Sequence, residues 1–122
     1  MGTHPVKLAM PVTVIVDGYD TVDGGEIRFS DENDYTGGTM VNRAVCWGSN
    51  DECLGSGPVT VRDSNATVYL STSSGTFSND FYIAGNGWVD NFFGPVGALP
   101  FSSGTVLTDD LILSSNTAMI VV

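Results

Sequence analysis

Two stretches of the 122-residue chain decide its fold: residues 33–42 read Asn-Asp-Tyr-Thr-Gly-Gly-Thr-Met-Val-Asn, and residues 54–61 read Leu-Gly-Ser-Gly-Pro-Val-Thr-Val. In each stretch, glycines suited to a turn lead directly into a short strand of β-branched residues. Comparable turn and strand units recur over the rest of the chain, and good helix formers are scarce. The sequence therefore predicts an all-β protein.

Short candidate strands follow one another, separated by glycine-rich turns. Most of them alternate between apolar and polar positions, whereas the strand at 111–113 is apolar throughout and is expected to be covered on both faces. This spacing fits either an antiparallel sandwich or a parallel β-solenoid. The candidate strands are 12–16, 26–29, 39–41, 45–47, 59–62, 67–70, 81–84, 98–101, 105–107, 111–113 and 118–122.

The two opening stretches closely resemble the autotransporter-associated β-strand repeat, also called the passenger-associated transport repeat. The resemblance implies a right-handed parallel β-helix, a β-solenoid of about four to five coils, in a secreted or surface-displayed protein. It covers residues 25–122, whereas residues 1–24 do not match and are expected to form an extended N-terminal arm and a first strand. The matching residues are Asn33, Tyr35, Thr36, Gly37, Gly38, Thr39, Val41 and Asn42, then Leu54, Gly55, Ser56, Gly57, Pro58, Val59, Thr60 and Val61.

The overall charge excludes two classes of partner. The formal net charge is −10, with four basic residues against fourteen acidic ones, so the chain has no basic face for nucleic acid or for anionic membranes. The longest apolar run, residues 12–16, is far shorter than the ~20 residues that a membrane-spanning helix needs. We therefore expect neither nucleic-acid binding nor membrane insertion.

The two cysteines, Cys46 and Cys53, are too few for a zinc site without further ligands. In the repeat family, an inward apolar residue is expected where Cys46 stands. A disulfide that closes the short loop between the two cysteines is the preferred interpretation, and it implies a compartment outside the reducing cytosol. The alternative is two reduced thiols.

Catalytic chemistry is not expected. The one histidine, His4, lies in the N-terminal segment, so no Ser-His-Asp or Cys-His arrangement can be assembled. Acidic residues cluster around 17–26, 31–34, 50–52 and 109–110, where they suit either calcium binding or simple solvation. Their spacing matches no calcium motif, and we expect a non-enzyme without metal or cofactor.

Aromatic residues and a glycosylation sequon offer two surface features. Trp88, Phe92 and Phe93 are candidates for stacking on a glycan, and they make a carbohydrate-binding adhesin module the alternative function; core packing is the competing role. Asn65 begins an Asn-Ala-Thr sequon and is a possible glycosylation site in a predicted turn.

Self-association is the leading functional expectation, because a solenoid exposes unpaired strand edges at both ends. The N-terminal arm with strand 12–16 is expected to add to the edge of a neighbouring subunit, giving a homo-oligomer or filament of an extracellular or cell-surface fibre. The alternative places strand 12–16 in an intramolecular first coil, in a fragment of a longer passenger protein. The predicted contact residues are Val12, Val14, Ile15, Val16, Met119, Ile120, Val121 and Val122.

Overall fold

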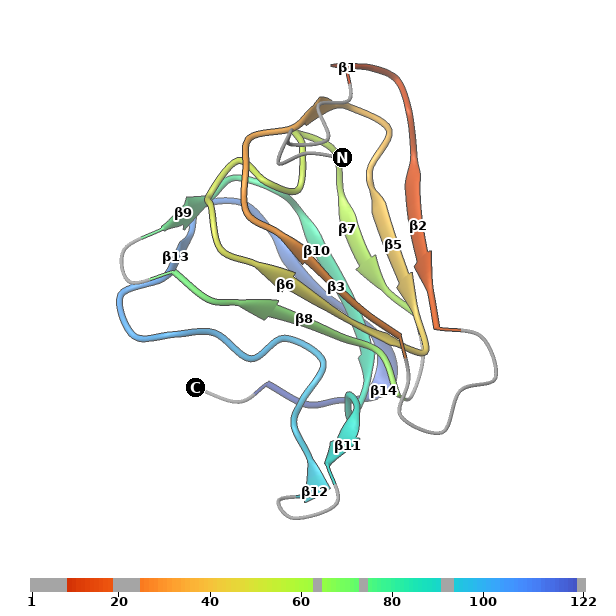
Figure 1. Cartoon of the computed structure of the whole chain (residues 1–122). Helices are drawn as coiled ribbons and strands as arrows, with labels where there is room; N and C mark the ends of the chain where they lie inside the picture. Colours follow the sequence, from red (N-terminus) through yellow and green to blue (C-terminus); the bar gives the residue numbers. More distant parts are fainter. Residues whose placement is uncertain (1–8, 19–24, 63–64, 73–74, 91–93, 121–122) are drawn as a thin grey trace.

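The computed structural model of the chain describes residues 9–18, 25–62, 65–72, 75–90 and 94–120. All regular structure in these ranges is β-strand and no helix occurs in them, which confirms the expected all-β class. Figure 1 shows how the strands are arranged. They are β1 (Ala9–Met10), β2 (Val14–Asp17), β3 (Gly25–Phe29), β4 (Asp34–Tyr35), β5 (Thr39–Asn42), β6 (Ala44–Gly48), β7 (Val59–Val61), β8 (Thr67–Leu70), β9 (Thr76–Phe77), β10 (Phe81–Gly85), β11 (Val89–Asp90), β12 (Gly94–Pro95), β13 (Val106–Leu107) and β14 (Leu111–Ala118).

The largest sheet joins its five strands in chain order, β2-β5-β7-β10-β14, and every neighbouring pair is parallel. Parallel neighbours exclude the antiparallel sandwich that the strand spacing had left open. The register aligns residues of the same kind in columns that run across the sheet. One column is Val14, Thr39, Val59, Phe81 and Leu111, and the next inward column is Val16, Val41, Val61, Ile83 and Leu113.

A second sheet joins β3, β6 and β8, again parallel and in chain order. Residues 98–101, which the sequence predicts as a strand, extend it through a parallel bridge between Leu70 and Phe101. The N–H groups of Val68 and Leu70 donate to the carbonyls of Ala98 and Pro100, both at 3.0 Å. Residues 98–101 therefore continue the ladder of this sheet, although they are too irregular to form a strand of their own.

Short strands form two further small sheets beside the two larger ones. β1 pairs with β4 and β9 with β13, both parallel, and the N–H of Ser56 donates to the carbonyl of Tyr35 between them. The side chain of Asn79 donates to the carbonyls of Gly55 and Gly57 at 3.0 and 2.8 Å. This amide connects the backbone of successive segments where regular pairing is interrupted.

The core lies between the sheets and is lined by the inward columns. Full burial of a Val, Leu, Ile or Phe side chain stabilises a fold by roughly 1.5–3 kcal/mol, so these columns supply the main stabilising term. One polar pair lies among them, because the Tyr35 hydroxyl and Thr39 Oγ1 are 2.6 Å apart. The core residues are Val41, Ala44, Cys46, Cys53, Leu54, Val59, Val61, Ala66, Val68, Leu70, Phe77, Phe81, Ile83, Ala98 and Leu99.

Strand β14 differs from its prediction. It runs over eight residues instead of ending at Leu113, and its pairing with β10 shifts, so that Ile83 pairs with Leu113 but Gly85 pairs with Ala118. The polar residues 114–117 therefore form a bulge opposite Ala84, because β10 has one residue where β14 has four. No separate strand forms at the predicted range 118–122: Met119 makes two backbone hydrogen bonds, and residues 121–122 lie outside the described ranges.

The turn glycines allow a test of how closely two segments approach. Gly87 and Gly94 have positive φ values of 81° and 76°. A Cβ on Gly87 would collide with the carbonyl of Gly97, whereas a Cβ on Gly94 would meet nothing within 4 Å.

We expect Gly94→Ala to lower the free energy of unfolding by about 1–2 kcal/mol, the cost of the left-handed backbone. Gly87→Ala adds a backbone clash and should cost about 4 kcal/mol or more. Urea denaturation of both variants measures the difference, and equal losses would contradict the close approach of residues 87 and 97.

Candidate functional site: the terminal sheet edges

Two strands end the five-stranded sheet in the described part of the chain, and their outer edges form the candidate site. We call β2 the leading edge and residues 111–113 of β14 the trailing edge. In the structure, β2 pairs with β5 of the same chain, which is the intramolecular alternative left open above. Among the described residues, each edge strand has one neighbour in this sheet, so one side of its backbone pairs with no described strand.

At the trailing edge the inward columns end without a cover. Phe81 and Ile83 are fully buried, but their register partners Leu111 and Leu113 are 38% and 60% exposed. The expectation that strand 111–113 is covered on both faces is therefore wrong, because its inward side chains Leu111 and Leu113 are exposed. The sequence prediction also missed Leu111 and Leu113 as contact residues, although their alternation about Ile112 marks them as inward.

The leading edge is apolar in the same way. Ile15 is 61% exposed and Val12 is exposed, while Val14 and Val16 are half-buried. Thr13 links this segment to the turn before β5, because its Oγ1 donates to the carbonyl of Gly37 at 3.1 Å. The predicted contact residues of strand 12–16 thus lie together on one sheet edge.

The C-terminal residues continue from β14 towards the second sheet. The N–H of Met119 donates to the carbonyl of Gly85 at 3.0 Å, and the carbonyl of Met119 accepts from Ala98 at 2.7 Å. Met119 and Ile120 are both exposed, whereas Val121 and Val122 lie outside the described residues. Residue 119 therefore begins to cover the edge formed by residues 98–101.

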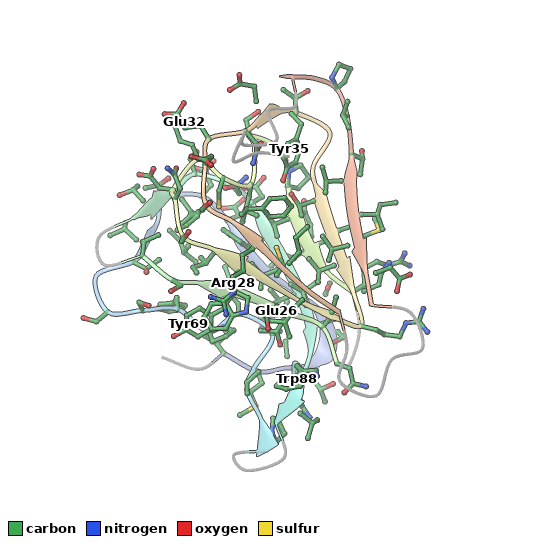
Figure 2. The ribbon with its side chains drawn as sticks, in the orientation of Figure 1. Glu26, Arg28, Glu32, Tyr35, Tyr69 and Trp88 are labelled. Carbon is green, nitrogen blue, oxygen red and sulfur yellow. The ribbon has the colours of Figure 1, made fainter. Side chains whose placement is uncertain are left out.

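The outer face of the second sheet holds a stack that sequence reasoning missed. The rings of Trp47 and Tyr69 lie 4.5 Å apart, and the Arg28 guanidinium lies 4.6 Å from the Trp47 ring. Arg28 also pairs with Glu26 at 2.9 Å (Figure 2). Trp47 lies between Arg28 and Tyr69 in the register of the sheet, so these contacts stabilise the alignment of the three strands.

The predicted glycan contacts are only partly described. Trp88 is half-buried and its backbone N–H donates to Thr67 Oγ1 at 2.8 Å, while Phe92 and Phe93 lie outside the described residues. Figure 2 places Trp88 apart from the stack of Arg28 and Tyr69. Glycan binding through these aromatic residues stays a prediction.

Asn65 suits the surface position that glycosylation needs. Its side chain is exposed, its φ is 65°, and its N–H donates to the carbonyl of Gly87 at 3.1 Å. Asparagine tolerates this left-handed backbone better than most residues. Modification of Asn65 remains a prediction.

Acidic residues meet around one hollow of about 270 Å³, which is lined in part by Asn33, Asp34, Asp51 and Glu52. Asn33 donates to the carbonyl of Cys53 at 2.8 Å, and its buried Oδ1 has no partner. Within the described ranges, no group of three or more His, Cys, Asp and Glu side chains is arranged to hold a metal ion. The hollow therefore lacks the ligand set that calcium requires.

The cysteines point into the core and are free thiols in the structure, not the bridged pair preferred from the sequence. Cys46 is an inward residue of β6, as the repeat pattern implies, and both thiols pack as small apolar groups. Burial, with a smaller contribution from nearby Cys53, raises the pKa of Cys46 to about 12, and burial also raises the pKa of Cys53. Protonated, buried thiols react slowly.

No family model, curated protein or solved structure matches the chain. The resemblance to the autotransporter-associated repeat therefore stays a prediction. The described residues also contain no helix with the length and hydropathy of a membrane span.

Titration with a thiol reagent tests the state of the cysteines. We expect two reactive thiols after denaturation without reductant, and almost none in the folded protein at pH 8, because both side chains are buried. Absence of reactive thiols in the denatured protein would instead establish the disulfide.

Chelation tests the acidic hollow. We expect excess EDTA to leave the midpoint of thermal unfolding unchanged within about 1 °C, because no complete ligand set exists in the described residues. Calcium-saturated EDTA controls for ionic strength, and a fall of many degrees with free EDTA alone would show that a bound ion supports the fold.

Proposed function

We propose that the chain is a non-catalytic structural module of an extracellular or cell-surface protein or fibre. It is a right-handed β-solenoid whose copies associate end to end through their terminal strand edges. The observation that carries this proposal is the exposure of the inward columns at the trailing edge, where Leu111 and Leu113 are exposed although their register partners Phe81 and Ile83 are fully buried. Exposed apolar side chains at a sheet edge are typical of an interaction surface.

The order of the strands supports the solenoid. The chain runs through β1-β2-β3 and then β4-β5-β6, and each strand of the second set pairs in parallel with its counterpart in the first. The two larger sheets continue this order with β7 and β8. The last described turn contains β13 and β14 followed by Met119. This repetition supports a solenoid, for which we propose about four to five coils.

A structural role also suits the chemistry of the molecule. The described side chains bring together no nucleophile with a base, and the most perturbed groups, Tyr35 and Cys46, are buried and have pKa values raised to about 12 by burial. Groups poised for catalysis have pKa values near the working pH. Their burial here supports packing roles.

Substitution at the trailing edge tests the association. Leu113→Lys places a charge where an added strand would bury it, at a position exposed in the single chain, so the fold should persist. We expect its dissociation constant for self-association to rise at least about tenfold, or ~1.4 kcal/mol, in sedimentation velocity over a concentration series.

Val89→Lys is the matched control, because Val89 is 51% exposed and belongs to the separate two-stranded sheet of β11 and β12. It should assemble as the unmodified chain does. An unmodified chain that stays monomeric at its highest soluble concentration would contradict end-to-end association.

A further inference from the structure

We infer that a second copy of this chain docks its leading edge on the trailing edge of the first. Val14 then pairs with Leu111 and Val16 with Leu113, in parallel. This inference rests on the proposed function and adds the partner, the direction and the register of the contact. The joint is head to tail, so each added copy leaves a new trailing edge.

A hydrogen-bond rule within the chain defines this register. Along one column of the five-stranded sheet, each N–H donates to the carbonyl that immediately precedes its register partner in the next strand. The four bonds have closely similar lengths, which shows that the geometry repeats without drift. They are Val14 to Gly38 at 3.0 Å, Thr39 to Pro58 at 2.9 Å, Val59 to Asp80 at 2.8 Å and Phe81 to Asp110 at 2.9 Å.

Leu111 is the next residue in that column. Parallel strands alternate the direction of their backbone groups, so the N–H of Leu111 points away from β10 and towards the free edge. Applying the same rule, its acceptor is the carbonyl of Thr13 in the next copy, since Thr13 immediately precedes Val14. The backbone at the trailing edge is therefore already arranged to receive β2.

The side chains agree with this register. Inward, Val14 and Val16 of the next copy would cover the exposed Leu111 and Leu113, continuing two apolar columns. Outward, Ile15 would lie beside Ile112, as Met40 lies beside Ile15 within the chain. A shift by one residue would place Ile15 against the inward column and would expose Val14 and Val16.

The bulge in β14 limits the contact. Residues 114–117 leave the regular ladder, and the Ser114 hydroxyl donates to the carbonyl of Ile83 at 3.0 Å. Bulges at sheet edges restrict strand addition. Because the regular part of the edge ends at Leu113, other registers along β14 are disfavoured.

Charge sets the conditions for assembly. Each copy has a formal charge of −10, so copies repel one another at low ionic strength. Salt screens this repulsion, with a Debye length of about 10 Å at 0.1 M. The contact itself is apolar and backbone-mediated, so association should strengthen as sodium chloride is added.

Disulfide trapping between two separately prepared variants tests the register. Residues paired on adjacent strands have Cα atoms about 4.8 Å apart, within the range that a disulfide spans. Full-length Ile15→Cys is mixed with full-length Ile112→Cys under mild oxidation, and the mixed dimer is quantified by mass. We expect at least tenfold more of it than with Ile15→Cys and Ser115→Cys, because residue 115 lies in the bulge.

A second pair, Thr13→Cys with Asp110→Cys, occupies the neighbouring register position and guards against a single variant that misfolds. The unmodified chain, whose own thiols are buried, gives the background. Equal trapping with Ser115→Cys, or mainly like-with-like dimers, would overturn the register while end-to-end association stands. Absence of association at every salt concentration would overturn both this inference and the proposed function.

Discussion

Backbone hydrogen bonding between successive parallel strands is the interaction on which every other feature of this molecule depends. Each strand of the five-stranded sheet takes its position from the strand before it, and the same donor and acceptor geometry recurs at every step. A parallel ladder without drift places equivalent residues directly beside one another. The apolar columns, the aromatic stack and the exposed ends all follow from that alignment.

The alignment has both a favourable and an unfavourable consequence. Within the five-stranded sheet, apolar residues of neighbouring strands lie side by side, and Val41, Val61 and Ile83 are fully buried in one such column. At β14 the same alignment leaves Leu113 exposed, because no described strand pairs with the outer side of β14. The high negative charge and the polar bulge at residues 114–117 oppose indiscriminate association at that end.

The second sheet shows how side chains reinforce the ladder from outside. Arg28, Trp47 and Tyr69 occupy one outward column, and their contacts at 4.5–4.6 Å bridge three consecutive strands. Inside the same strands, Cys46 fills a position between Ile27 and Val68. Its burial explains why this thiol is a packing group, whereas the short spacing to Cys53 alone had favoured a bridge.

Much of the fold could be predicted from local sequence. Alternation of apolar and polar residues located β8 at its observed bounds and seven other strands within two residues, because side-chain direction along a strand has a period of two. The short strands β1, β4, β9, β11 and β12 were not predicted. Turn glycines between the strands and the inward position of Cys46 also followed from local pattern and the family resemblance. The all-β class needed no tertiary information.

Tertiary structure alone decided which strands are neighbours and which columns end in solvent. Ile83 and Leu113 are both apolar residues in alternating strands, yet one is buried and the other is 60% exposed. Local sequence could not separate them, because the difference lies in whether another strand follows in the ladder. The stack of Arg28 on Trp47 and Tyr69 was hidden for the same reason, since its members come from three strands that only the parallel register brings together.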